Sequence, residues 1–468
     1  MSTLGQKPAT QHVSFQKQTI TGNGGTSYTL QQSVSQASDI EVFVNNTRQE
    51  PTVAYTANNT TLTMTGAVNA SDSFYVIFQG KAIQTAGLPV DAAITASTIT
   101  TSQTITSTGN ITTSGTVNTP SINGGQIGGR RNIVINGGMQ ISQRGTSFSV
   151  SDNIYTLDRF LTEFSGLGAF TLTQSTDAPD GFGNSLKLDC TTADASPASG
   201  DVFQLFYRIE GQNLQQLKKG TSSAEKVTLS FFVKSNKTGN MQVNLRDANS
   251  RIIGATYAIS SANTWERKTI TFDGDTSGSI ANDNTSELTI EFPVGSGSNY
   301  TSGAVPTAWE ASSDADRNAG SNINIADNTA NEWYLTGLQL EVGSQATPFE
   351  HRSFGEELAL CRRYYFQKIN GNSQPVGIGT YISSGQIRTY IDFPVEMRAN
   401  PTVVTSSGTA HFNMENPSDD FDGGWVLLQV NKNSATLYAT GNVSGTTSYS
   451  GIIRSKSADS RLAFASEL

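Results

Sequence analysis

Reactive and charged side chains are scarce in this chain of 468 residues. It contains 3 histidines, 2 cysteines and 15% charged residues, and its net charge at pH 7 is -9. Because such an acidic chain offers no basic patch to a phosphate backbone, we expect no nucleic-acid partner. Cys190 and Cys361 are too few for a disulfide framework or a metal cluster, so both are predicted to be free, buried thiols.

Long apolar segments are also missing. No run of about 18 apolar residues occurs. Residues 1–15 are polar and lack the apolar core of a signal peptide. We therefore expect a protein that is made in the cytosol and does not insert into a membrane.

Catalytic motifs are missing as well. The sequence has no Gly-x-Ser-x-Gly elbow, no His-Glu-x-x-His pair and no phosphate-binding loop. Asp419, Asp420 and Asp422 lie close together, as the paired carboxylates of a glycosidase do, but residues 417–424 have the composition of a turn. The sequence predicts no enzyme activity, no catalytic residue, no metal ligand set and no cofactor.

A polar segment with a regular apolar stripe occupies residues 81–129. Four apolar residues recur in it at a spacing of six: Ile99, Ile105, Ile111 and Val117. Because six is an even number, an extended chain places all four on one face. One such stripe buries too little surface to fold alone, so we interpret the segment as the fibrous β shaft of a homotrimer with these residues in its core. A flexible Thr/Ser/Gly linker is the alternative.

The rest of the chain favours strands and turns, which predicts an all-β protein. Residues 1–80 are predicted to form a small β-sandwich, because short apolar runs alternate with Asn, Asp and Gly. Residues 74–78 are apolar throughout and are predicted to be its central strand.

Residues 130–352 contain a longer series of predicted strands, at 226–234, 241–245, 265–272, 288–292 and 333–340. Their alternating apolar residues and the turn clusters between them predict a β-sandwich. The spacing resembles that of the jelly rolls of carbohydrate-binding modules. This resemblance implies that the opening and closing segments of the domain lie side by side.

A polar insertion at residues 294–331 interrupts this series. Its Trp309 is expected to anchor the loop rather than to stack on a sugar. Asp314 and Asp316 are expected in a solvated turn, because they lack the full ligand loop of a calcium site. Whether a calcium ion is bound stays open.

A short helix is predicted at residues 353–366. Ser353 and Glu356 form a capping box at its start. An apolar stripe follows at helical spacing, made of Phe354, Leu358, Cys361 and Tyr365. The stripe is expected either to meet its copies on a trimer axis or to pack on its own jelly roll.

Several motifs resemble a module that is common in bacteriophage tail fibre proteins. They are residues 131–146 and 155–160 at the opening of the domain, and 337–343, 347–352 and 356–365 at its close. Residues 1–80 are similar to the N-terminal attachment domain of fibres from short-tailed phages of the marine, cyanophage-like type. The resemblance implies a fibre in the tail of the virion, made in the host cytoplasm, that docks on tail adaptor or nozzle proteins through residues 1–80.

Residues 367–468 are then predicted to be a distal receptor-binding β-sandwich, the tip of the fibre. Its expected partner is a glycan of the host surface, such as lipopolysaccharide. The candidate contacts are the aromatic residues of this tip and one arginine: Tyr381, Arg388, Tyr390, Trp425, Tyr438 and Tyr449. A bacterial lectin-like adhesin and a tailspike polysaccharide hydrolase are the alternative functions.

The shaft interpretation predicts the effect of charges in the stripe. Replacing Ile105 and Ile111 by Asp places two charges per chain, six per trimer, on the axis, where desolvation outweighs any contact. The variant should sediment or scatter light as a monomer while its separate β domains stay folded. A variant with the mass of the parent trimer would show that the stripe does not face inward.

Overall fold

The computed structural model describes residues 16–79, 130–415 and 418–468, and nearly all of their regular structure is β-strand. The predicted all-β class is therefore confirmed. The shaft residues Ile99, Ile105, Ile111 and Val117 lie outside the described residues. Within the described ranges, no helix is long and apolar enough to span a bilayer.

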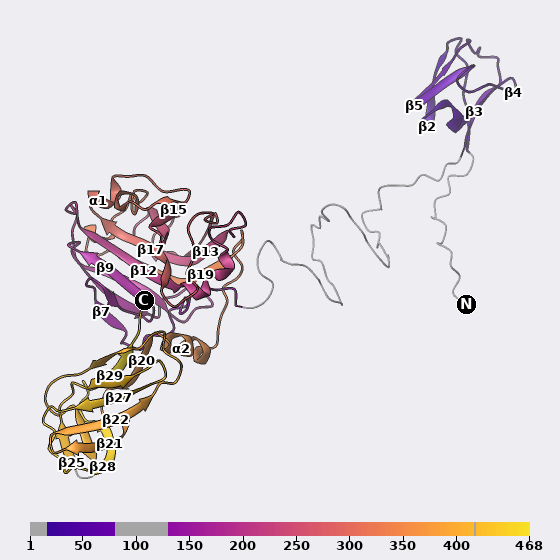
Figure 1. Ribbon diagram of the computed structural model, residues 1–468. Helices are drawn as coiled ribbons and strands as arrows, with labels where there is room; N and C mark the ends of the chain where they lie inside the picture. The colour runs from indigo at the N-terminus through magenta and orange to yellow at the C-terminus, as the bar shows by residue number, and fades with distance from the viewer. Residues whose placement is uncertain (1–15, 80–129, 416–417) are drawn as a thin grey trace, which may run out of the picture. The chain divides into compact units, whose positions relative to one another are not determined.

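Residues 16–79 form a compact small domain of two sheets (Figure 1). Its strands are β1 (Gln16–Thr19), β2 (Ser27–Val34), β3 (Ile40–Val44), β4 (Thr47–Arg48), β5 (Tyr55–Met64) and β6 (Phe74–Phe78). One sheet has the order β1-β6-β3-β4, and the other pairs β2 with β5. The prediction that residues 74–78 form a central strand is confirmed, because β6 has a hydrogen-bonded neighbour on both sides.

Residues 130–352 form a two-sheet jelly roll. Its strands are β7 (Ser147–Ser149), β8 (Ile154–Tyr155), β9 (Phe160–Ser165), β10 (Ala169–Ser175), β11 (Ser185–Thr192), β12 (Val202–Glu210), β13 (Val227–Ser235), β14 (Gly239–Asp247), β15 (Arg251–Ile259), β16 (Glu266–Phe272), β17 (Ser286–Ser296), β18 (Glu310–Ala311) and β19 (Glu332–Val342). The sheet orders are β16-β13-β19-β11-β10-β7 and β18-β15-β14-β17-β12-β9-β8. All five strands predicted from the sequence are present, and aromatic side chains such as Phe231, Phe292 and Trp333 fill the core between the sheets.

The insertion after β17 begins with the short helix α1 (Ser298–Thr301). Two of its side chains, Trp309 and Arg317, fix it to the jelly roll. Trp309 is an anchor, as expected: its indole Nε1 donates to the Asp273 carbonyl at 2.7 Å, and its ring packs on the core. The predicted turn at Asp314 and Asp316 is a 3-10 turn whose Arg317 is buried against Glu291. The described residues contain no group of three or more acidic, His or Cys side chains placed to hold a metal ion.

The opening and closing motifs of the jelly roll lie side by side, as the resemblance implied. The Ile133 amide donates to the Leu340 carbonyl, and the Leu338 amide donates to the Gly137 carbonyl, each at 2.9 Å. A Cβ atom on Gly137 would lie 2.1 Å from the Leu338 oxygen, so only glycine permits this approach.

Helix α2 (Phe354–Arg362) begins as predicted but ends earlier. The Ser353 hydroxyl accepts from the Glu356 amide at 3.3 Å, whereas the Glu356 carboxylate pairs with Arg130 instead of closing the capping box. The predicted stripe is wrong at both ends. Phe354 is 60% exposed, and Tyr365 belongs to the following strand because the chain leaves the helix at residue 363.

Of the two packing alternatives for α2, the structure shows contact with its own jelly roll. Cys361 is buried in a small cluster with Ile135, Ile141 and Tyr364, and Leu358 packs against this cluster. The helix therefore packs on the jelly roll and also contacts the first strand of the next domain (Figure 1).

The described residues of the distal domain form ten strands in two sheets. They are β20 (Tyr365–Asn370), β21 (Pro375–Ser383), β22 (Gln386–Asp392), β23 (Thr402–Thr405), β24 (Phe412–Glu415), β25 (Ser418–Phe421), β26 (Val426–Val430), β27 (Ser434–Ala439), β28 (Ser450–Ser455) and β29 (Arg461–Ala465). The sheet orders are β20-β29-β23 and β25-β24-β28-β21-β22-β27-β26. The turn predicted at residues 417–424 is wrong in its first half, because β25 pairs with β24 as a hairpin.

Both cysteines are free and buried, as predicted. Burial raises the pKa of the Cys190 thiol, and it raises that of the Cys361 thiol well above the usual value. Because the thiolate is the reactive form, the native protein at pH 8 should react only slowly with an aromatic disulfide reagent. Unfolding in guanidinium chloride should release 2 reactive thiols per chain. Reaction of the native protein at the rate of a free thiol would contradict the burial.

Candidate functional site

The structure separates the six predicted receptor contacts into three groups. Tyr390 and Tyr449 are exposed, Arg388 and Tyr438 are half-buried, and Tyr381 and Trp425 are buried in the core of the distal domain. The last two are therefore wrong as surface contacts.

Trp425 is buried because it immediately precedes β26 and points between the sheets. Only 1% of it is exposed, and its ring packs edge-on against Phe412 and Phe421 with centroids 5.6 Å away. It is therefore part of the hydrophobic core of the distal domain.

Tyr381 lies on the inward face of β21. Its hydroxyl donates to the Asp419 carboxylate at 2.8 Å, and burial, together with this carboxylate, raises the pKa of Tyr381. Asp420, by contrast, accepts from Asn413 at 2.7 Å and pairs with Lys456. These two carboxylates have structural partners and do not face each other across an open site.

The outward faces of the middle strands bring together three of the predicted contacts. In the register of β22 and β27, Arg388 lies opposite Tyr438 and Tyr390 lies opposite Thr436. On the other side of β22, Thr380 of β21 lies opposite Arg388 and is followed by Ser450 of β28. We call this surface the distal sheet face; it consists of Ile378, Thr380, Arg388, Tyr390, Val426, Thr436, Tyr438, Ser450 and Ile452.

The distal sheet face combines apolar surface with hydrogen-bonding groups. Ile378 is 71% exposed and Tyr390 is 56% exposed. The Tyr390 hydroxyl donates to Asp392 at 2.7 Å, and the hydroxyls of Thr380 and Ser450 lie 2.7 Å apart. Tyrosine rings with polar neighbours on a flat surface suit a ligand with one apolar face and a polar edge.

A second feature, missed by the sequence analysis, is the junction between the jelly roll and the distal domain. Glu467, two residues after β29, lies between two guanidinium groups of the jelly roll. Its carboxylate accepts from Arg144 at 2.7 Å and from Arg159 at 2.6 Å. Arg208 donates to the Leu468 carbonyl at 2.8 Å. The end of the described chain is thus hydrogen-bonded to β12 and to the segments that precede β7 and β9.

A further buried carboxylate ties the end of α2 to the jelly roll. Glu210 of β12 accepts from the Nε and Nη2 atoms of Arg363 at 3.0 and 2.9 Å, and from the Tyr364 hydroxyl. Burial by itself would raise the pKa of Glu210, but these hydrogen bonds outweigh it and the pKa is lowered. The stabilisation is therefore present above the ordinary pKa of a glutamate, about 4.3, and is lost as the pH falls further.

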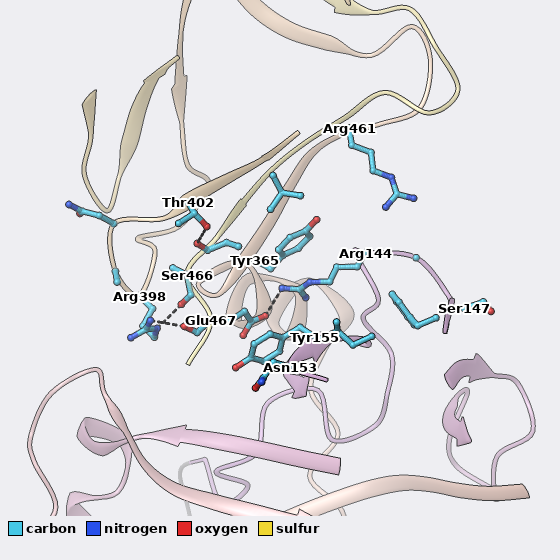
Figure 2. Close-up of a pocket in the computed structure, with 17 residues that line it drawn as sticks. Arg144, Ser147, Asn153, Tyr155, Tyr365, Arg398, Thr402, Arg461, Ser466 and Glu467 are labelled. Atoms are coloured by element: carbon cyan, nitrogen blue, oxygen red, sulfur yellow. Dashed lines mark hydrogen bonds and ion pairs between the residues drawn. The ribbon is translucent and has the colours of Figure 1, made fainter. Parts of the chain in front are cut away.

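Beside this junction is an open cleft of about 830 Å³ (Figure 2). The jelly roll contributes the segment around β7 and β8, and the distal domain contributes its three-stranded sheet. The polar and aromatic side chains of its wall are Arg144, Ser147, Phe148, Asn153, Tyr155, Tyr365, Arg398, Asn400, Thr402, Arg461, Ser466 and Glu467. The guanidinium of Arg144 stacks on the Tyr365 ring, 3.7 Å from its centroid.

Several residues of this junction lie in motifs that the sequence had already singled out, although their contact with the end of the chain was not predicted. The motifs that resemble the tail fibre module supply Arg144, Tyr155, Arg159 and Tyr364, but nothing local indicates their shared partner Glu467, which lies 323 residues from Arg144. Arg144, which stands among polar residues in the sequence, and Arg159 were the only local indication of an ion pair at this place.

The Glu467 contact predicts how the junction fails. Glu467→Ala leaves the guanidinium of Arg159, which is 1% exposed, without its carboxylate, and breaking a buried ion pair in this way costs about 3–5 kcal/mol. We expect a lower melting temperature and faster proteolytic cleavage near residue 364. Glu396→Ala removes one side of an exposed pair with Lys432 and should change neither. Equal stability of the two variants would show that Glu467 does not hold the junction.

Comparison with known proteins gives structural similarity only. No protein-family model and no curated protein matches the chain. Among solved structures, a putative sugar binding protein from Bacteroides thetaiotaomicron aligns with 45% of this chain and 100% of its own, at 11% identity and a TM-score of 0.28. A family 11 carbohydrate-binding module from Clostridium thermocellum aligns with 42% of this chain and 95% of its own, at 10% identity and a TM-score of 0.22.

A phage protein is also among the similar structures. The enzymatically active domain of bacteriophage CBA120 tailspike protein 4 aligns with 45% of this chain at 13% identity and a TM-score of 0.25, and the match spans 21% of the tailspike chain. Identities and TM-scores of this size assign no function. The tail-fibre resemblance therefore rests on the sequence motifs, and the candidate sites rest on the geometry described above.

Proposed function

We propose that the chain is a structural tail fibre protein of a bacteriophage and that its distal domain binds a glycan of the host surface. The observation that carries this proposal is the distal sheet face, where Arg388, Tyr390 and Tyr438 lie together in an exposed, partly apolar surface.

Exposed apolar side chains are concentrated in this domain. Of the 10 large hydrophobic residues exposed in the described part of the chain, 8 belong to the distal domain: Ile378, Ile382, Tyr390, Val404, Val426, Leu428, Tyr449 and Ile452. Single exposed apolar residues need no explanation, but a contiguous group marks an interaction surface. Six of the eight, all except Val404 and Tyr449, belong to strands of the seven-stranded sheet, and they support recognition by this sheet.

The chemistry of the face suits a saccharide. The rings of Tyr390 and Tyr438 offer apolar surfaces for the C–H faces of sugar rings, and Arg388, Thr380 and Ser450 offer hydrogen bonds to hydroxyls. A shallow face of this kind binds weakly in one copy. Three copies on one shaft raise the avidity by about 10² to 10⁴, which gives the proposed homotrimer its purpose.

The other parts of the chain take their roles from the resemblance to tail fibres. Residues 1–80 dock on tail adaptor or nozzle proteins, residues 81–129 form the shaft, and the jelly roll and α2 carry the tip. The protein is then a component of the virion tail. The proposal includes no catalysis, which agrees with the structural partners of Asp419 and Asp420.

The distal sheet face is tested by removing its two tyrosine rings. Each stacked aromatic contributes about 0.5–1.5 kcal/mol, so Tyr390→Ala combined with Tyr438→Ala should weaken adhesion to host cells by about tenfold or more. The mass in solution should stay that of the parent. Phe354→Ala removes an exposed aromatic ring of α2 that lies outside both the distal sheet face and the cleft beside the junction; it is the matched control and should adhere normally.

Two outcomes would overturn the assignment. Unchanged adhesion of the double variant would move the receptor site elsewhere, and a change in mass would identify the face as a contact between copies. Incubation with purified host polysaccharide separates binder from enzyme, because new reducing ends would favour a tailspike hydrolase.

A further inference from the structure

The junction cleft carries positive charge that its own wall does not balance. Four charged side chains line it, Arg144, Arg398, Arg461 and Glu467, which sum to 3 - 1 = +2. Behind the wall, the buried Asp158 pairs with Arg144 and the buried Arg159 pairs with Glu467, and these two opposite charges leave the sum unchanged. The whole chain has a net charge of -9, so this excess is local and of the opposite sign.

The single carboxylate of the wall is not available to neutralise the remaining arginines. Glu467 is already shared by Arg144 and Arg159. Arg398 donates instead to three backbone carbonyls, those of Ser466 at 2.6 Å, Glu467 at 2.7 Å and Asn284 at 2.8 Å. Its charge is therefore held in place without a carboxylate partner.

Donors remain free on the cleft wall. Among the described residues, the side chains of Arg461 and Asn400 make no hydrogen bond or ion pair, and both residues are exposed. Arg144 adds positive charge but no free donor, because it pairs with Glu467 at 2.7 Å and with Asp158 at 3.6 Å, and its Nη1 atom is buried. In Figure 2, Arg461 and Arg144 project from two different segments of the wall. A ligand in the cleft would meet the free donors of Arg461 and Asn400 and the positive charge of Arg144.

The size and the aromatic side of the cleft point to the class of ligand. Its 830 Å³ lies in the range of small-molecule sites, about 300–1,000 Å³, which accommodates more than a single inorganic anion. Tyr155 and Phe148 add ring surface, and the amides of Asn153 and Asn400 suit hydroxyl groups.

We propose that the junction cleft is a second binding site, for a saccharide that carries a carboxylate or a phosphate group. Arg461 binds the anionic group, Arg144 and Arg398 add positive charge to the wall, and Tyr155 and the two asparagines contact the sugar. The choice of a saccharide rests on the proposed function, whereas the requirement for an anion rests on the geometry of the cleft. This site is separate from the distal sheet face, because none of its wall residues belongs to that face.

The test is isothermal titration of the full chain with four probes. They are a hyaluronan tetrasaccharide as the carboxylate sugar, glucose 6-phosphate as the phosphate sugar, maltotetraose as the neutral sugar, and inorganic phosphate. We expect the chain to bind at least one charged sugar, more tightly than inorganic phosphate and maltotetraose, and less tightly at high salt.

Matched variants locate the binding. Arg461→Ala should weaken binding of the charged sugar by about five- to tenfold, as expected for loss of one charge-assisted hydrogen bond. Asn400→Asp, which adds a negative charge to the same wall, should weaken it as well. Arg454→Ala removes another exposed arginine of the distal domain, one that pairs with Glu415 outside the cleft, and should have no effect.

The outcomes distinguish this site from the proposed receptor surface. The variant with Tyr390→Ala and Tyr438→Ala should still bind the charged sugar, even if its adhesion is lost. The proposal is overturned if neither charged sugar binds, if Arg461→Ala and Asn400→Asp both bind like the parent, or if maltotetraose binds equally well. Inorganic phosphate binding as tightly as glucose 6-phosphate would mean an adventitious ion only.

Discussion

The distal part of the molecule depends on one buried contact, the Glu467 carboxylate between the guanidinium groups of Arg144 and Arg159. Removing charges from water is costly, so buried pairs of this kind specify geometry more than they add stability. Here they determine how the three-stranded sheet of the distal domain meets the opening strands of the jelly roll. The position of the junction cleft follows directly from that arrangement.

The motifs that resemble tail fibre proteins acquire a physical meaning at this junction. The Asn132 amide donates to the Glu350 carboxylate at 2.6 Å, Gln143 donates to the Tyr365 carbonyl at 2.6 Å, and Arg159 stacks on the Tyr364 ring. The opening motif therefore binds the closing motif and the start of the distal domain. These residues build the platform for the distal domain, whereas the proposed receptor contacts lie on the seven-stranded sheet of that domain.

The two candidate sites differ in the physics of recognition. The distal sheet face is flat, partly apolar and exposed, so it depends on stacking and on repetition in several copies. The junction cleft has walls from two domains and is positively charged. A single anionic group therefore gains more binding free energy in the cleft than on the distal sheet face. A fibre with both sites would combine contact by the outer surface of the tip with selection for acidic sugars at its base.

The sequence by itself determined the strands, the start of the helix and the state of the cysteines. These follow from local rules: alternation along a strand, as in Val227 to Phe231, a hydroxyl cap at Ser353, and the small number of thiols. Residues 74–78 and the adjacency of the opening and closing motifs were also predicted correctly. Periodicity and capping act within a few residues, so they can be read without knowing the fold.

Only the tertiary structure decided which side chains are available for function. Tyr381 and Tyr390 belong to neighbouring strands and look equivalent in the sequence, yet the first faces the core and the second faces outward. Trp425 packs in the core, and Tyr365 begins β20 of the three-stranded sheet instead of extending the helix. Glu467 meets Arg144 across 323 residues. Strand register and domain packing depend on contacts between distant segments, and no local pattern encodes those contacts.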